Sequence, residues 1–345
     1  MRGNMDNNIL FSNYLEIFAY RDEFAIFNKM NGALVLLSPE NIRQNSSKQW
    51  VCTSTDNRTL SYLKENLFFV SNEYVQKLIY DADHPNTNYN DVLLIVGTTE
   101  RCNCGCSYCY ELDWPKTDSL PSSDYIDWIF EYICEIMEHA DNDANITIKY
   151  FGGEPLLCSK IFNEINEKIN NFTNKTSKKL NIHYQMDSNC ILLTREIFSL
   201  FPNLKVSTTL SLQPDHDSLR SGSYQNTIEN LLAVSDLFKL PQYKLVIGYN
   251  IHHGNVSDFP EFLQQIKKLG LNCQFDVQNI VNHESVPFTN HLSNKEFSKL
   301  YCDLIIPSLI ENGYDIQILP PHGIQRKCNG VNILNRRFFA NGTQA

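Results

Sequence analysis

The sequence predicts an α/β fold built on parallel strands, preceded by a smaller α+β domain. From Val92 onward, six short apolar segments alternate with segments of helical periodicity. Strands that alternate with helices form parallel sheets joined by right-handed crossovers. Residues 1 to about 85 lack this alternation. Six strand–helix units suit a doubly wound sheet or an incomplete, curved barrel, and in both folds ligands bind at the carboxyl ends of the strands.

The first 85 residues hold short runs of β-forming residues, EIFAY, EFAIF and GALVLLS. The Asn31-Gly32 pair between the last two runs is typical of a β-hairpin. The segments SPENIRQ and LSYLKENLFFV predict short helices, so a small domain in the style of a winged helix fits. The polar segment 81–91 predicts a linker to the rest of the chain.

The alternating region begins with a buried strand and continues with regularly spaced elements. The six predicted strands are 92–96, 146–150, 182–186, 206–212, 244–250 and 273–277. Apolar residues at i, i+3 and i+4 predict helices over 122–140 and 257–270, with Gly270 ending the second. Ser122 or Ser123 is expected to cap the first helix. A further amphipathic helix is expected over 292–313.

Composition excludes several functional classes. The 345 residues carry 29 Lys and Arg against 39 Asp and Glu, a net charge of −10. This acidic balance argues against broad nucleic-acid binding, which needs a basic surface. No apolar run approaches the length of a membrane span, and the first residues do not resemble a signal peptide. We therefore expect a cytoplasmic protein with no membrane and no nucleic-acid partner.

Four of the 11 cysteines crowd into one loop directly after the first predicted strand. Cys102, Cys106 and Cys109 have the spacing C-x3-C-x2-C. Three thiolates on a short loop can bind three corners of a cubane iron–sulfur cluster and leave the fourth iron open to a substrate. With Cys104 as a fourth thiolate, the alternative is a tetrahedral zinc site. Structural zinc loops usually pair two separate C-x2-C knuckles, however, and no second knuckle is present.

Four segments, in matching order, resemble motifs of the radical S-adenosylmethionine enzymes. CNCGCSYCYE resembles the cysteine motif of that family, C-x3-C-x-aromatic-C. YFGGEPLL (150–157) resembles its GGEP motif, and DSNC (187–190) its T/S-N-G turn. LSLQPDHDSLR (210–220) resembles S-L-D-G-P-x3-H-D-x2-R, although Gln213 replaces the aspartate and the following glycine is absent. The resemblance covers about residues 90–280 and implies a partial (β/α)6, TIM-like barrel over 86–290.

The resemblance also implies a cofactor site. Cys102, Cys106 and Cys109 would hold a [4Fe-4S] cluster, and the open iron would chelate S-adenosylmethionine. In the family, the GGEP motif holds the amino group of the cofactor, and hydroxyls at the next strand ends contact its carboxylate and ribose. The cofactor-binding residues that the resemblance implies are Tyr108, Gly152, Gly153, Glu154, Ser188, Ser211 and Arg220. Each of them could instead be an ordinary loop residue.

The implied roles differ among these residues. Arg220 could pair with the carboxylate of the cofactor, and Tyr108 could lie beside its adenine. His216 and Asp217 match the family's HD pair and are expected to shape the loop. Asp276, an isolated carboxylate at the end of the sixth strand, is the candidate catalytic acid or base.

The implied activity is modification of a ribosomally made peptide or protein. The cluster would cleave S-adenosylmethionine reductively to a 5′-deoxyadenosyl radical that abstracts hydrogen, and a flavodoxin or ferredoxin would serve as reductant. Residues 1–85 resemble the leader-peptide-binding domains of such enzymes. Alternatives are an anaerobic sulfatase-maturase-like enzyme, a catalytically idle peptide-binding partner protein, and a zinc-stabilised α/β protein.

The last segment, 291–345, is expected to form a helix and the start of a SPASM-like extension. RKCNGVNILNRRFFANGTQA resembles the opening of that extension, where a two-stranded turn follows C-x-G. Family members continue with cysteines that bind auxiliary clusters, whereas here Cys328 is the single candidate ligand in the tail. We therefore expect either a piece of a longer enzyme, truncated within the extension, or a natural variant without those clusters.

Overall fold

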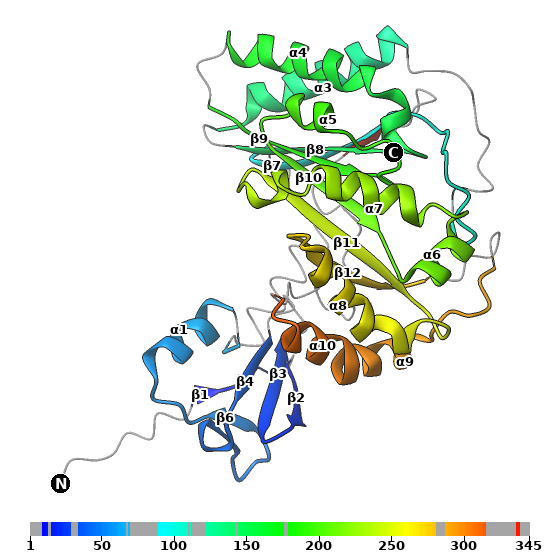
Figure 1. The fold of residues 1–345 in the computed structure, drawn as a ribbon. Helices are drawn as coiled ribbons and strands as arrows, with labels where there is room; N and C mark the ends of the chain where they lie inside the picture. Colours follow the sequence, from blue (N-terminus) through cyan, green and yellow to red (C-terminus); the bar gives the residue numbers. More distant parts are fainter. Residues whose placement is uncertain are drawn as a thin grey trace. The chain divides into compact units, whose positions relative to one another are not determined.

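A computed structural model of the chain describes residues 9–12, 15–28, 34–66, 68–69, 89–109, 111, 122–141, 144–175, 179–280, 287–314 and 336–338. These residues divide between two compact units (Figure 1). The first lies within Met1–Asn86 and the second within Thr87–Gln317, together with a short strand, β13 (Arg336–Phe338). The predicted linker over 81–88, the Asn31-Gly32 turn and Cys328 lie outside the described residues.

The first unit contains two antiparallel sheets of three strands each. One has the order β2 (Leu15–Tyr20), β3 (Glu23–Asn28), β4 (Leu34–Leu37), and its strands coincide with the three predicted runs. The other has the order β1 (Ile9–Leu10), β6 (Trp50–Cys52), β5 (Ile42–Gln44). Helix α1 spans Asn57–Glu65.

Two local predictions in this unit need correction. SPENIRQ was expected to be helical, but only Pro39–Asn41 forms a 3₁₀ turn, after which the chain enters β5. The reason is tertiary, because Ile42 is buried and pairs with Cys52 across the sheet. Helix α1 also begins before the predicted segment, because the Asp56 carboxylate accepts the Thr59 N–H at 2.8 Å and caps the helix there.

The second unit is built on six parallel strands that follow one another in chain order across the sheet. They are β7 (Asp91–Gly97), β8 (Asn145–Phe151), β9 (Asn181–Asp187), β10 (Leu204–Thr209), β11 (Tyr243–Ile251) and β12 (Gln274–Asn279). The predicted parallel α/β sheet is thus confirmed. β10 ends at Thr209 rather than at the predicted Leu212, and β13 adds an unpredicted parallel strand beside β7.

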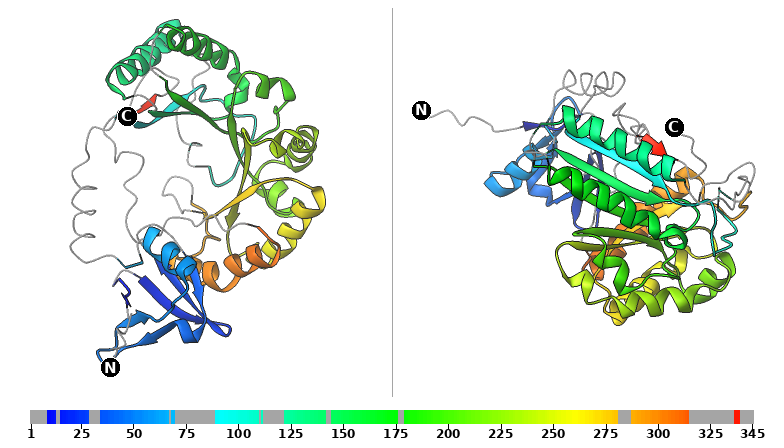
Figure 2. Two further views of the ribbon diagram at one scale, coloured as in Figure 1. Left: turned by 90° about the vertical axis from the view of Figure 1, so that its left-hand side faces the viewer. Right: turned by 90° about the horizontal axis from the view of Figure 1, so that it is seen from above.

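The strand order distinguishes between the two architectures that the sequence allowed. A doubly wound sheet reverses its winding direction once, whereas here each crossover moves one strand further the same way. Right-handed crossovers in a single direction place every connecting helix on the same face. Figure 2 (left) shows the strands along the inner side of an arc and the helices outside it. The second unit therefore has a partial-barrel, TIM-like fold.

Helices connect the parallel strands, and the first and last of them match those predicted over 122–140 and 257–270. The connecting helices are α3 (Ser123–His139), α4 (Lys160–Thr173), α5 (Arg195–Ser199), α6 (Gln213–Leu219), α7 (Tyr224–Ala233) and α8 (Phe259–Leu269). Ser122, not Ser123, caps α3 by accepting the Tyr125 N–H at 3.2 Å. Gly270 ends α8 with a φ of 68°, a left-handed conformation that glycine adopts without steric cost.

The predicted helix over 292–313 is interrupted. It consists of α9 (Asn294–Leu300), a π-helical turn (Tyr301–Ile305) and α10 (Ile306–Glu311). Ser293 and Glu296 form a capping box at its start. Pro307, the second residue of α10, has no N–H to donate, so the regular α-helical hydrogen-bond ladder is interrupted where the π turn meets α10.

The two faces of the parallel sheet differ in polarity. Side chains alternate between faces along a strand, and on β10 Leu204 and Val206 are fully buried on the helix side. Lys205, on the opposite face, is only half-buried. On that inner face the Lys149 ammonium and the Asp187 carboxylate form an ion pair of 2.7 Å. The inner wall of the partial barrel is therefore polar, whereas the outer face carries the core.

The core beneath α4 gives a test of this packing. Phe162 is fully buried, with its ring 4.6 Å from that of Tyr150 and 5.7 Å from that of Phe201. We expect Phe162→Ala to lower the free energy of unfolding by about 3–5 kcal/mol, because it leaves a cavity. The control Leu157→Ala removes a side chain that is 38% exposed and should change the same quantity by less than about 1 kcal/mol. Urea denaturation measures both, and equal losses would contradict the described packing.

Candidate active site

The four clustered cysteines lie on the loop that leaves the carboxyl end of β7. Backbone hydrogen bonds hold this loop over the neighbouring strand. Gly153 N–H donates to Thr99 O at 2.9 Å, and Glu154 N–H donates to Arg101 O at 2.8 Å. The cysteine loop and the GGEP segment are thus paired directly, which places both motifs at one edge of the sheet.

Gly152 and Gly153 are required by this pairing. A Cβ on Gly152 would lie 2.3 Å from Thr99 O, and one on Gly153 would lie 2.2 Å from Arg101 O. Gly152 also has a φ of 138°, which L side chains rarely adopt. Glycine was expected here for close approach to a ligand. In the structure, what both glycines approach is the backbone that carries the cysteines.

The cysteine side chains are partly exposed and lie among hydrogen-bond donors. The Cys104 N–H donates to Cys102 Sγ at 3.4 Å, and the Asn189 side-chain amide approaches the same sulfur at 3.8 Å. Such N–H···S contacts stabilise a thiolate. Cys104 Sγ lies 3.5 Å from Cys106 Sγ and 3.3 Å from Arg220 O. Its hydrogen bond with Cys106, aided by the Arg220 guanidinium, lowers the pKa of Cys104 to about 6.

A single metal ion has no ready site here. Among the residues that the structure describes, no three Cys, His, Asp or Glu side chains converge as ligands of one ion. A cubane cluster makes a different demand, because each thiolate binds a separate iron and the sulfurs need not meet at one point. Three thiols on one short loop, with N–H donors to sulfur and a nearby guanidinium, suit such an anionic cluster.

Glu154 joins two loops through a fully buried carboxylate. Its Oε1 accepts the Ser188 hydroxyl at 2.8 Å and the Leu156 N–H at 3.0 Å, and its Oε2 accepts the Asn189 N–H at 2.7 Å. Burial raises the pKa of Glu154, and these hydrogen bonds oppose the rise. The carboxylate therefore fixes the turn after β8 to the turn after β9, and it holds Ser188 inside the protein.

Cys190 occupies the glycine position of the T/S-N-G turn that its segment resembles. Its φ of 62° is left-handed, and the side chain is completely buried. Its backbone N–H donates to the Ser188 hydroxyl oxygen at 2.9 Å. A left-handed non-glycine residue costs about 1–2 kcal/mol, so this turn carries backbone strain. The turn nevertheless has the conformation that the glycine of the motif would adopt.

Arg220, at the end of α6, is a buried guanidinium without a carboxylate partner. Its Nη1 donates to the Tyr108 hydroxyl at 3.1 Å, and the residue is 8% exposed. No carboxylate of the described residues lies within ion-pair distance, and Nε has no hydrogen-bond partner. A buried charge is costly unless it is paired. This cation is therefore suited to an anionic ligand next to the cysteine loop.

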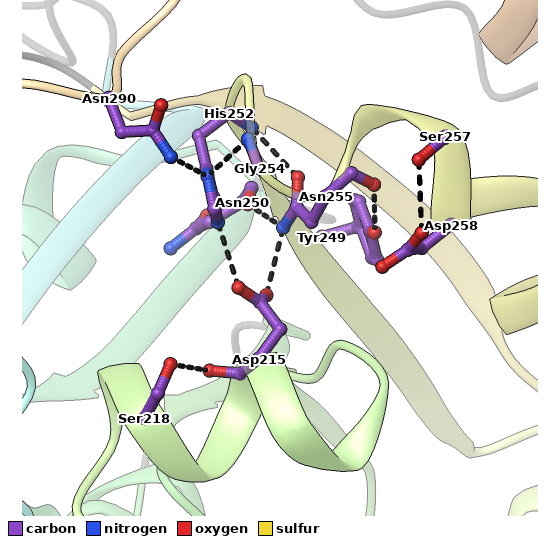
Figure 3. A network of polar contacts seen from close by, with 10 residues as sticks. All are labelled: Asp215, Ser218, Tyr249, Asn250, His252, Gly254, Asn255, Ser257, Asp258 and Asn290. Atoms are coloured by element: carbon purple, nitrogen blue, oxygen red, sulfur yellow. Dashed lines mark hydrogen bonds and ion pairs between the residues drawn. The ribbon is translucent and has the colours of Figure 1, made fainter.

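A second network ties α6 to the loop after β11 and to Asn290 (Figure 3). The two oxygens of Asp215 accept hydrogen bonds from His252 Nε2 and Asn255 Nδ2, both at 2.9 Å. His252 Nδ1 accepts the Gly254 N–H at 3.0 Å and lies 3.1 Å from Asn290 Nδ2. Burial raises the pKa of Asp215, but its hydrogen bonds outweigh this effect and hold the pKa below its usual value.

Sequence reasoning missed this network. Asp215 immediately precedes the His216-Asp217 pair, which drew attention by its resemblance to a motif. In the structure His216 Nε2 lies 3.0 Å from the Ser223 hydroxyl, and Asp217 accepts the Tyr224 N–H at 3.0 Å. No spacing rule connects Asp215 with His252, because 37 residues separate them.

Asp276 lies on β12, paired in register with Gly248 of β11. Its Oδ2 accepts the Gln278 side-chain amide at 2.5 Å, and its buried Oδ1 has no hydrogen-bond partner among the described residues. Burial lowers the pKa of Lys205 on β10, and the negative charge of Asp276 opposes this shift. Among the residues that the structure describes, no contact joins Asp276 to the cysteine loop, and the side chain lies on the inner wall of the barrel.

Comparison with known proteins assigns the fold to a class. No family model matches the sequence. The structural neighbours are radical S-adenosylmethionine enzymes, and the partial barrel has their fold. Streptococcus suis SuiB bound to S-adenosylmethionine superimposes with a TM-score of 0.55 at 12% identity, over 97% of this chain and 82% of that one. The structure of anSMEcpe with bound AdoMet gives 0.53 at 16% identity, over 65% of this chain and 62% of that one.

Two curated proteins are similar in sequence. An uncharacterised protein of Methanocaldococcus jannaschii is 26% identical over 215 residues, 60% of this chain and 69% of its own length. The radical SAM cyclopropyl synthase TigE of Paramaledivibacter caminithermalis is 23% identical over 324 residues, 79% of this chain and 66% of its own length. The chain thus spans about two thirds of these relatives. None of the described helices combines the length and apolar character that a bilayer crossing requires.

The glycine pairing can be tested by adding one methyl group. We expect Gly153→Ala to destabilise the second unit by about 2 kcal/mol or more, because the added Cβ meets backbone, which cannot yield as a side chain can. In the control Gly248→Ala, the Cβ would lie 3.4 Å from its nearest atoms, an ordinary contact distance. Thermal unfolding of both variants measures the difference. A tolerated Gly153→Ala would show that the two loops are not paired as described.

Proposed function

We propose that this protein is a radical S-adenosylmethionine enzyme that holds a [4Fe-4S] cluster and modifies a peptide or protein substrate. The observation that carries the proposal is the buried guanidinium of Arg220. It contacts Tyr108 of the cysteine loop and has no carboxylate partner among the described residues. Cys102, Cys106 and Cys109 supply three thiolates, and the positive charge of Arg220 is available to an anionic ligand. The partial-barrel fold and its structural neighbours support the same proposal.

The residues present fit the proposed cofactors. Cys102, Cys106 and Cys109 hold the cluster, and Arg220 pairs with the carboxylate of S-adenosylmethionine. Gly152, Gly153 and Glu154 fix the loop that receives the amino group, and Tyr108 lies beside the adenine. When bound, the two cofactors together supply an electron and a 5′-deoxyadenosyl radical able to remove hydrogen from an unactivated carbon. The protein orients them and excludes water and oxygen.

The inner wall of the barrel is the proposed substrate site. Ligands in such folds bind at the carboxyl ends of the strands, and this wall carries Lys149, Asp187, Lys205 and Asp276. Asp276 is the proposed acid or base, because a carboxylate can exchange a proton and its Oδ1 has no hydrogen-bond partner among the described residues. A flavodoxin or ferredoxin is the proposed reductant. The cytoplasm is the proposed location, since a reducing compartment keeps the cluster thiols free.

Peptide or protein substrates are proposed from the known proteins that this chain resembles. SuiB has been seen bound to the precursor peptide SuiA, and anSMEcpe bound to the Kp18Cys peptide. The similar curated enzyme TigE is a cyclopropyl synthase. We propose that residues 1–85 bind a leader peptide by strand addition, because β2 and β4 each pair on one side only among the described strands. The tail over 291–345 is proposed to open a SPASM-like extension.

Anaerobic reconstitution with iron and sulfide tests the radical core. The full chain should bind about four irons, as a [4Fe-4S] cluster requires. With dithionite and S-adenosylmethionine it should release 5′-deoxyadenosine. Replacing Cys102, Cys106 and Cys109 together by Ala should abolish both iron binding and cleavage. Replacing Cys134, Cys273 and Cys302, three similarly exposed thiols, should preserve them. Unchanged cleavage in the first variant would refute the proposal, and iron without cleavage would favour an idle, peptide-binding partner.

Peptide binding is tested separately with the full chain. The probe is a fluorescent copy of a short peptide encoded beside the reading frame of this chain. We expect binding to slow hydrogen exchange of backbone amides in β2 or β4, since an added strand supplies new acceptors. Slower exchange confined to residues 89–314 would contradict leader binding by the first unit.

A further inference from the structure

Cys104 is the one cysteine of the crowded loop that the proposed cluster does not use. Its sulfur nevertheless lies 3.5 Å from the sulfur of Cys106, a proposed cluster ligand. A disulfide bond needs the two sulfurs about 2.0 Å apart, so a shift of about 1.5 Å would join them. Both side chains are partly exposed, so a small oxidant in solution can reach them. Cys104 and Cys106 are therefore placed as a pair that is able to form a disulfide.

The backbone around this pair is held by the turn between α6 and α7. The Ser221 hydroxyl donates a hydrogen bond to Gly105 O at 3.0 Å, and the Ser107 N–H donates to Leu219 O at 2.9 Å. These two bonds fix the residues immediately before and after Cys106. Most of the conformational entropy that ring closure would cost is therefore already lost when the chain folds.

Gly105, the single residue between the two cysteines, allows this close approach. A Cβ on Gly105 would lie 2.8 Å from Ser221 Oγ, so a side chain here would push away the hydroxyl that holds the loop. A disulfide that spans only one intervening residue closes a small, strained ring. Strained and exposed disulfides are the ones that thiols reduce readily. A bond between Cys104 and Cys106 is therefore expected to be reversible.

We propose that Cys104 and Cys106 form a reversible disulfide, and that Cys104 thereby protects Cys106 until the cluster is assembled. A thiol that is oxidised alone can proceed to sulfinic acid, which ordinary thiols do not reduce, whereas a disulfide returns to two thiols. While it is in the disulfide, Cys106 has no thiolate to bind iron. The disulfide itself is independent of the proposed function, but its consequence for cluster assembly rests on that function.

The reaction with a small-molecule disulfide such as oxidised glutathione balances as a two-electron exchange. The sulfur of one cysteine attacks the oxidant and releases one thiol, which leaves a mixed disulfide. The sulfur of the other cysteine then displaces the second thiol and forms the bond between Cys104 and Cys106. The protein loses two protons and two electrons, and the oxidant gains both as two molecules of free thiol.

Mass spectrometry of the full chain tests the pairing. The iron-free chain is reduced, separated from the reductant, treated with oxidised glutathione, alkylated and digested. The peptide that holds Cys104 and Cys106 should lose two hydrogens, retain no glutathione and recover both thiols in dithiothreitol. Cys104→Ser should retain glutathione on Cys106, because no second thiol displaces it. The control Cys134→Ser, which changes a partly exposed thiol elsewhere, should behave like the wild type.

Two results would overturn the pairing. One is glutathione retained on Cys106 of the wild type. The other is a bond from Cys104 to Cys102 or Cys109 in place of Cys106.

The cluster-loaded chain tests the consequence for assembly. After anaerobic reconstitution, the same oxidation should form the disulfide about tenfold less or lower still, because iron binding stabilises the free thiolate of Cys106. Equal disulfide formation in the loaded chain would overturn the protective role. A chain that forms the disulfide but binds no iron would confirm the pair and refute the proposed function instead.

Discussion

The buried carboxylate of Glu154 is the interaction on which the rest of the site depends. It accepts hydrogen bonds from the loop after β9 and from its own turn after β8. The turn after β8 also forms backbone hydrogen bonds with the cysteine loop after β7. Three consecutive strand ends are thus joined through one anion and two glycines. A buried anion is stable here because three donors, two of them rigid backbone N–H groups, compensate for its lost hydration.

The charged side chains of this site differ in whether the protein itself supplies their hydrogen-bond partners. Glu154 and Asp215 are each surrounded by donors from the protein. Arg220 and Asp276 each retain a buried polar atom without a partner among the described residues. Buried polar atoms of folded proteins are almost always hydrogen-bonded, so unpartnered ones in a strand-end site indicate ligand contacts. The proposed ligand contacts are therefore Arg220 and Asp276, whereas Glu154 and Asp215 are held by groups of the protein itself.

The partial barrel makes this division possible. Its helices bury the outer face of every parallel strand in a continuous apolar core, while the inner wall is free to carry charged and polar residues. A closed eight-stranded barrel fills its interior with side chains, whereas an arc of six strands need not. The architecture thus explains how Lys149 and Asp187 occupy central strands of a parallel sheet and Asp276 its edge strand β12.

The sequence by itself determined the alternation of strands and helices, the end of α8 at Gly270 and the position of the cysteine loop, because these depend on local periodicity, turn conformation and spacing. Only the tertiary structure decided the strand order, the strand at Ile42, and the backbone that Gly152 and Gly153 approach. The tertiary structure also decided the contact between Asp215 and His252, because Asp215 lies on α6 and His252 follows β11. Hydrogen bonds between distant segments follow from how the chain is folded in space, and no local pattern in the sequence encodes them.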